Sequence, residues 1–105
     1  MNIEIYRVGP SLDSSSSRDE QQYILSILEQ GKNIMLDLSE CKYVSSAGLR
    51  VMLYAYKVAA SNELKLYLVG VSKEVKEVMD ITGFKHFFQY FETVEDCKNQ
   101  VICKE

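Results

Sequence analysis

Hydrophobic and polar residues alternate along the chain in short segments whose period changes from one segment to the next. Residues 3–8 alternate with period two, which predicts a strand with one covered face. Residues 33–38 hold an apolar core of four residues without clean alternation, which indicates a strand covered on both faces. Two further strands are predicted, one at 64–69 and a short aromatic one at 87–91.

Helical signals fill the gaps between these strands. The first predicted helix covers about 18–30, with Ser17 and Glu20 as a capping box and Gly31 at its C′ position. The second covers about 46–61, and its apolar residues recur at helical spacing on one face, which predicts a buried stripe of Met52, Ala55, Tyr56 and Ala59.

Two more helices complete the predicted order. One begins at a Ser72 cap and ends at Gly83, and the last covers about 94–103 after a capping pair of Thr93 and Asp96. Strands that alternate with helices predict an α/β fold with an open, mainly parallel sheet of about four strands and about four helices. We expect one domain over 1–105, with the N-terminal strand at an edge of the sheet.

Composition narrows the class of protein. Of 105 residues, 47% are hydrophobic and 26% are charged, as in ordinary globular domains. No apolar run approaches the roughly 18 residues of a membrane span, and the N-terminus lacks the pattern of a signal peptide, so a cytoplasmic location is expected. A net charge of −3 argues against nucleic acid or an anionic membrane as the main partner. The oligomeric state stays open, a homo-oligomer included.

Catalytic patterns are absent from the sequence. No serine lies in a GxSxG elbow, and neither a phosphate-binding GxxxxGK[ST] loop nor GxGxxG occurs, so neither an enzyme nor a bound cofactor is predicted. The lone histidine, His86, is interpreted as a structural or exposed residue. Cys41, Cys97 and Cys103 form no CxxC pair, and we expect buried or inert thiols.

Two carboxylates near the end of the second strand raise the question of a metal site. Asp37 at the strand end and Glu40 in the loop after it could both contribute ligands, but no third ligand is evident. We therefore interpret them as solvated loop charges and predict no metal.

The junction before the second helix is the most informative segment. Ser45 and Ser46 lie where a strand and loop meet the helix, and one of them is expected to be the N-cap. Gly48 at the third helical position costs about 1 kcal/mol relative to alanine. Its presence indicates that a neighbouring strand or a partner approaches the start of this helix closely. The loop from Ser39 to Ser46 also lies where partners of parallel sheets usually bind.

This junction resembles the signature of STAS domains and, more narrowly, of bacterial anti-sigma factor antagonists. The resemblance rests on Val44 to Leu53, on Leu66 to Val75 with the later Ile81-Thr82-Gly83-Phe84, and on Leu12-Asp13. It covers about residues 3–97. The chain departs from the family pattern at Pro10, where the family has glycine, and it lacks the family's usual strand before Ile3.

The resemblance implies a switch. In this family the unphosphorylated antagonist binds an anti-sigma factor and thereby frees a sigma factor. The anti-sigma factor is also a serine kinase, and it phosphorylates the antagonist. A phosphatase removes the phosphate and resets the system. The family pattern Asp-Ser-Ser/Thr-Gly, aligned on Gly48, places Ser45 at the aspartate and Ser46 at the acceptor. Ser46 is thus the predicted phosphorylation site and Ser45 the alternative.

Seven residues form the predicted partner-binding surface. They are Asp13, Tyr43, Ser45, Ser46, Gly48, Leu49 and Arg50. Core packing is the alternative for Tyr43 and Leu49, and a plain surface charge is the alternative for Arg50. The alternative function is a non-phosphorylated STAS adaptor subunit that binds a transporter ATPase or another signalling complex.

Overall fold

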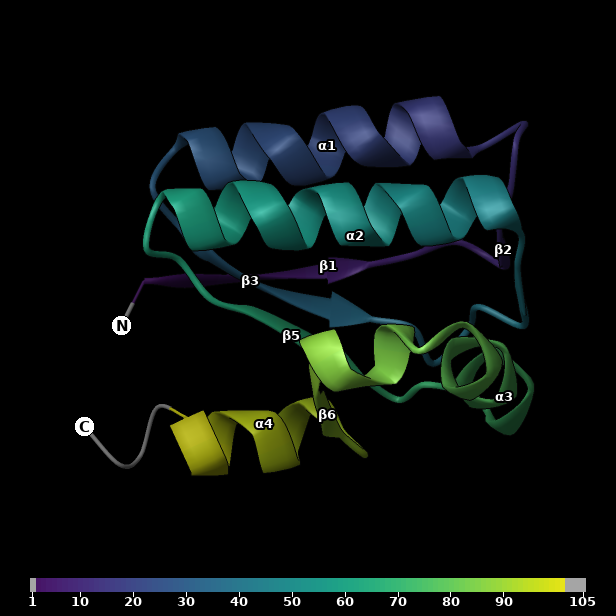
Figure 1. Ribbon diagram of the computed structural model, residues 1–105. Helices are drawn as coiled ribbons and strands as arrows, with labels where there is room; N and C mark the ends of the chain where they lie inside the picture. The colour runs from purple at the N-terminus through teal and green to yellow at the C-terminus, as the bar shows by residue number, and fades with distance from the viewer. Residues whose placement is uncertain (1, 102–105) are drawn as a thin grey trace.

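Four parallel strands form the main sheet of the computed structural model, which describes residues 2–101. Their order across the sheet is β1 (Ile3–Arg7), β3 (Asn33–Asp37), β5 (Leu66–Val69) and β6 (Gln89–Phe91) (Figure 1). The predicted parallel sheet, with the N-terminal strand at its edge, is confirmed.

Helices cover both faces of this sheet. On one face α1 (Ser17–Glu29) packs against α2 (Ser46–Ser61), whereas α4 (Val94–Val101) packs against β5 and β6 on the other face (Figure 1). Between β5 and β6 the chain forms α3 (Lys73–Thr82) and a 3-10 helix, η1 (Phe84–Phe87).

The two central strands alternate between two hydrophobic cores. In β3, Ile34 and Leu36 point into the larger core under α1 and α2, and Met35 points into the smaller core with Cys97 of α4. Burial of each such side chain stabilises the fold by about 1.5–3 kcal/mol. The expectation that this strand is covered on both faces is confirmed, as is the stripe of α2, in which Met52, Ala55 and Ala59 are buried and Tyr56 is half-buried.

The later helix caps follow the sequence prediction. The Ser72 hydroxyl accepts a hydrogen bond from the Val75 N–H at 3.2 Å, and Gly83 ends α3 in the left-handed conformation with φ of 79°. Before α4, Thr93 Oγ1 accepts from the Asp96 N–H at 3.0 Å. The capping residues therefore fix where both helices begin.

The predicted capping box of the first helix is wrong. The N-cap of α1 is Ser16, not Ser17, and it makes no side-chain cap bond. Ser16 Oγ donates instead to the Ser11 carbonyl at 3.1 Å, while the Glu20 carboxylate turns toward the Tyr6 hydroxyl. The expected reciprocal bonds between the N-cap residue and Glu20 are therefore not formed.

Two strand predictions also need correction. Phe87 belongs to η1 rather than to the last strand, because it packs on the ring of Tyr56 at a centroid distance of 5.6 Å. The predicted loop after β3 ends in a short strand at Tyr43–Val44. The last predicted helix is confirmed as far as Val101, and Cys103 lies outside the described residues.

Candidate functional site

A second, two-stranded sheet builds the site. In it β2 (Ser11–Leu12) pairs in parallel with β4 (Tyr43–Val44), with Leu12 opposite Val44. The Ser45 N–H continues this ladder with a 3.0 Å bond to the Leu12 carbonyl. The pairing therefore brings the segment before α1 beside the segment before α2, at the end of α2 that lies near α3 in Figure 1.

The two serines at this junction have different roles. Ser45 is the N-cap of α2, and its hydroxyl accepts from the Gly48 N–H at 3.4 Å. Ser46 is the first helical residue and is exposed. Within residues 2–101 the Ser46 hydroxyl has no hydrogen-bond partner. Only Ser46 thus offers a free, accessible hydroxyl at the helix start.

This division of roles predicts different stability effects. Ser45→Ala should lower the free energy of unfolding by about 1 kcal/mol, because it removes a helix cap. Ser46→Ala should change it by less than about 0.5 kcal/mol, as for other exposed positions. Urea unfolding of both variants checks this, and an equal loss in the two would contradict the assignment of Ser45 as the cap.

Gly48 marks a close approach within the chain. A Cβ atom at this position would lie 2.2 Å from the carbonyl oxygen of Leu12 and 2.9 Å from Leu12 Cγ. Of the two explanations open from the sequence, the neighbouring strand is therefore the one that the structure shows. Gly48 is buried, so the partner contact predicted for it is not available in this structure.

The other predicted contact residues divide into inward and outward side chains. Leu49 is 6% exposed and belongs to the main core, so core packing applies and the predicted partner contact is not available. Tyr43 is 57% exposed, and Arg50 is exposed one turn into α2. Tyr43 and Arg50 therefore remain candidates for partner contact.

Asp13 follows β2 directly and so lies next to Ser45 in the paired segments. Its Oδ1 accepts from the Ser15 hydroxyl at 2.7 Å and from the Ser15 N–H at 2.9 Å. These bonds hold the pKa of the Asp13 carboxyl below its ordinary value. Asp13 is thus a charged carboxylate that orders the turn beside the candidate site.

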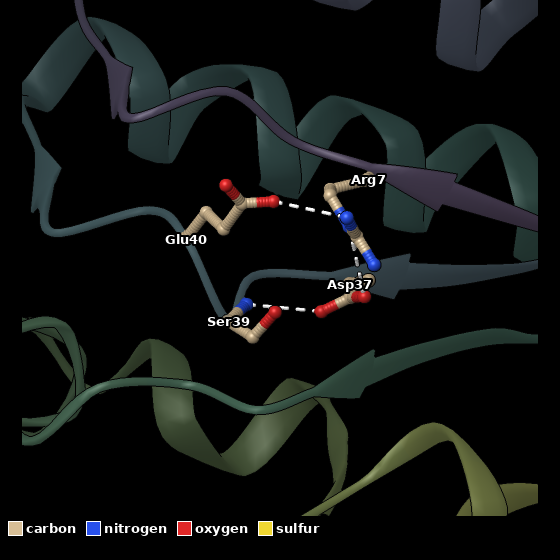
Figure 2. Close-up of polar contacts among 4 residues, drawn as sticks. All are labelled: Arg7, Asp37, Ser39 and Glu40. Carbon is tan, nitrogen blue, oxygen red and sulfur yellow. Dashed lines mark hydrogen bonds and ion pairs between the residues drawn. The ribbon is translucent and has the colours of Figure 1, made fainter.

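An arginine at the end of β1 organises the loop that leads to the site (Figure 2). Arg7 Nε lies 3.4 Å from Asp37 Oδ2, and its Nη1 lies 3.1 Å from Glu40 Oε2. Asp37 is 4% exposed, and its Oδ1 accepts from the Ser39 N–H at 3.0 Å. The interpretation of Asp37 as a solvated loop charge is therefore wrong, because its charge is buried and paired.

The pKa of Asp37 reflects competing effects. Burial alone would raise it, but hydrogen bonds from Ser39 and the Arg7 guanidinium outweigh burial and hold it below the ordinary value. A lowered pKa stabilises the folded state at a pH above the ordinary carboxyl value near 3.9, and this contribution is lost as the pH falls through the folded pKa.

Arg7→Gln should therefore destabilise the fold by about 1 kcal/mol at pH 7, a value kept small because the Arg7 side chain is 65% exposed. The difference from the wild type should shrink toward pH 3, below the ordinary carboxyl value, because the contribution of Asp37 is lost as the pH falls toward its lowered folded pKa. Chemical unfolding at the two pH values measures this, and Glu40→Gln, which removes only the exposed pair, is the control. An equal difference at both pH values would show that the arginine acts through packing alone.

Other candidate chemical groups lie away from the site or are inert. Cys41 and Cys97 are buried free thiols, and burial raises the pKa of Cys97 to about 11, so the prediction of buried thiols is confirmed for these two. His86 is exposed in η1, as interpreted. Among the described residues no three His, Cys, Asp or Glu side chains are grouped as metal ligands, and no helix in that part of the chain could span a membrane.

Residues 2–97 match the family model of the STAS domain. The chain belongs to the STAS domain family. A similar STAS protein is the anti-sigma-B factor antagonist of Staphylococcus epidermidis, which is 27% identical over 90 residues, or 85% of this chain and 83% of that protein. The family assignment made from the residues around Ser46 is thus confirmed.

Solved structures of anti-sigma factor antagonists share the fold. A putative anti-sigma factor antagonist from Thermotoga maritima has a TM-score of 0.86 at 20% identity over 95% of this chain and 87% of that one. The anti-sigma factor antagonist SpoIIAA in its unphosphorylated form has a TM-score of 0.82 at 16% identity over 97% of this chain and 90% of that one. The sheet and its helical layers are therefore those of STAS domains.

Sequence reasoning missed two structural residues of the site. Leu12 belongs to the family resemblance, but its carbonyl contact with the start of α2 depends on the β2–β4 pairing. Arg7 fits the alternation of a strand, and its partners lie 30 and 33 positions away in the chain. The available signal was that Arg7 ends a predicted edge strand and Asp37 ends the following predicted strand.

Proposed function

We propose that this STAS protein is an anti-sigma factor antagonist. In the proposed switch it binds an anti-sigma factor that is also a serine kinase, frees a sigma factor, and loses that binding when Ser46 is phosphorylated. The observation that carries the proposal is the exposed Ser46 hydroxyl at the first position of α2, beside a Ser45 hydroxyl that is engaged in capping. The similar protein of Staphylococcus epidermidis is an anti-sigma-B factor antagonist, which supports the same class of partner.

The fold can accept a phosphate at this position. The first turn of the 16-residue α2 presents unpaired backbone N–H groups and the positive end of the helix dipole, which favour a negative group. In the transfer, Ser46 Oγ bonds to the γ-phosphorus of ATP, ADP leaves, and a base of the kinase takes the hydroxyl proton. A phosphatase reverses the state by hydrolysis of the phosphoester.

The added charge of about −1.5 to −2 is directed to solvent and hence toward a bound partner. It must lose its hydration when the interface forms, so the phosphorylated form binds weakly without any refolding. Because Ser45 already holds the Gly48 N–H, a phosphate on Ser45 would displace a structural bond. This difference favours Ser46 as the acceptor.

Intact mass measurement on protein recovered from its native cells tests the proposal. We expect a fraction heavier by about 80 Da, the mass of one phosphoryl group, present in Ser45→Ala and absent in Ser46→Ala. The Ser46→Ala form should recover an anti-sigma factor from the same cells. No adduct under any growth condition, together with recovery of a transporter ATPase, would instead establish the adaptor function.

A further inference from the structure

The exposed face of α2 carries a row of residues that begins at Ser46. Arg50, Tyr54 and Lys57 follow Ser46 at spacings of four, four and three residues, so they share one helical face. All are exposed, Tyr54 to 46%. The row from Ser46 to Lys57 is about 16 Å long at the rise of an α-helix. We call Arg50, Tyr54 and Lys57 the basic stripe.

The positive charge of the basic stripe is not compensated within the chain. No acidic residue occurs in α2, and neither Arg50 nor Lys57 forms an ion pair with any described residue. By contrast, Arg7 pairs with Asp37 and Glu40, and Lys32 pairs with Glu4. A chain of net charge −3 thus presents two unpaired cations on the same helix face as its candidate switch residue.

We propose that the basic stripe docks on an acidic surface of the anti-sigma partner. This inference rests on the proposed function and adds to it the chemistry of the partner surface. Tyr54 lies between the two cations and supplies apolar contact area, and tyrosine and arginine are the residue types that dominate binding energy at protein interfaces. Carboxylates of the partner complete the pairs that Arg50 and Lys57 lack.

An acidic partner surface also explains the direction of the switch. A phosphate of charge about −1.5 to −2 at Ser46 meets carboxylates of the partner and is repelled. It also lies four residues before Arg50, the spacing at which opposite charges pair along a helix. Phosphorylation therefore nearly cancels the two charges of the stripe and turns Arg50 toward the phosphate. The same acidic surface of the partner thus attracts the basic stripe and repels the phosphate.

A protein partner fits this stripe better than a polyanion. Two cations separated by an exposed tyrosine give few phosphate contacts, whereas nucleic acids and anionic membranes are bound by larger clusters of lysine and arginine. The acidic surface of a folded partner can match two charges about 10 Å apart.

Charge reversal measures the stripe directly. The anti-sigma factor recovered with Ser46→Ala is purified, and its dissociation constant for the unphosphorylated chain is determined by calorimetry at 50 and 300 mM NaCl. We expect Arg50→Glu and Lys57→Glu each to weaken binding at least tenfold at low salt and to reduce its dependence on salt. Lys98→Glu, the same charge change on α4 across the sheet, should alter binding less than twofold.

A titration with a hexaglutamate peptide at low salt provides a test without the anti-sigma factor. Backbone amide shifts should move at Arg50, Tyr54 and Lys57 in the wild type, and these movements should vanish in the Arg50→Glu, Lys57→Glu double variant. If no anti-sigma factor is recovered, the proposed function fails. The titration still shows whether the basic stripe binds an acidic ligand.

Three results would overturn the inference and leave the proposed function standing. The first is wild-type affinity of both reversal variants for the anti-sigma factor, with binding still blocked by phosphate at Ser46. The second is a hexaglutamate response located elsewhere on the chain or absent. The third is tighter binding of the stripe to a 20-nucleotide DNA or to phosphatidylserine vesicles than to the anti-sigma factor.

Discussion

Ser46→Asp is expected to weaken binding to the anti-sigma factor at least a hundredfold while the fold stays intact. The carboxylate places a permanent negative charge at an exposed position of the proposed interface, where the wild type has a neutral hydroxyl. Association must remove its water, and about 2.8 kcal/mol of lost binding energy corresponds to that factor. Calorimetry with the purified anti-sigma factor measures the change.

Two variants separate the effect of position from the effect of charge. Gln100→Glu adds one negative charge to an exposed position of α4, on the other face of the sheet, and should bind within twofold of the wild type. Ser46→Ala should bind as the wild type does. Aspartate at a helix start is compatible with the helix dipole, so unfolding should be unchanged in Ser46→Asp. Wild-type affinity of that folded variant would show that the interface lies elsewhere.

The larger features of the fold could be predicted from the sequence because local patterns determine them. The range of α2 follows from the helical spacing of its apolar residues and from the serines at its start. The consecutive apolar residues of β3 predict a strand that is covered on both faces. Ser72, Gly83 and Thr93 have the local roles that their residue types favour. Such signals need no knowledge of distant contacts.

The start of α1 shows why other features escaped prediction. Ser16 and Ser17 are chemically equal candidates for the cap, and the choice between them depends on the Ser11 carbonyl and on Tyr6, which attracts Glu20. The two-residue strands β2 and β4 are likewise too short to have a period. They form because each provides the other's hydrogen-bond partner.

The candidate site was predicted in part. The exposure of Ser46 and Tyr43 agrees with the expected surface, whereas Leu49 and Gly48 turn inward. The sequence pattern around the helix start mixes residues that shape the site with residues that a partner can reach. Only the β2–β4 pairing separates the two groups, because it fixes which side of the α2 start faces Leu12.

For Gly48→Ala, helix propensity and tertiary packing predict opposite changes in stability. Helix propensity alone predicts that alanine stabilises α2 by about 1 kcal/mol. The structure predicts the opposite sign, because the new Cβ would lie 2.2 Å from the Leu12 carbonyl oxygen. That oxygen belongs to backbone and also accepts the Ser45 N–H, so it cannot move without breaking the ladder.

We therefore expect Gly48→Ala to lower the free energy of unfolding by at least about 2 kcal/mol and the Tm by about 10 °C. Gly9→Ala is the matched control, because a Cβ at that position would have no atom within 4 Å and the φ of Gly9 is not positive. It should leave the Tm unchanged or slightly raised, since it reduces the freedom of the unfolded chain. Thermal unfolding by circular dichroism compares the two.

A Gly48→Ala variant as stable as the wild type would show that the start of α2 can move away from Leu12. The paired strands would then not fix the position of Ser46.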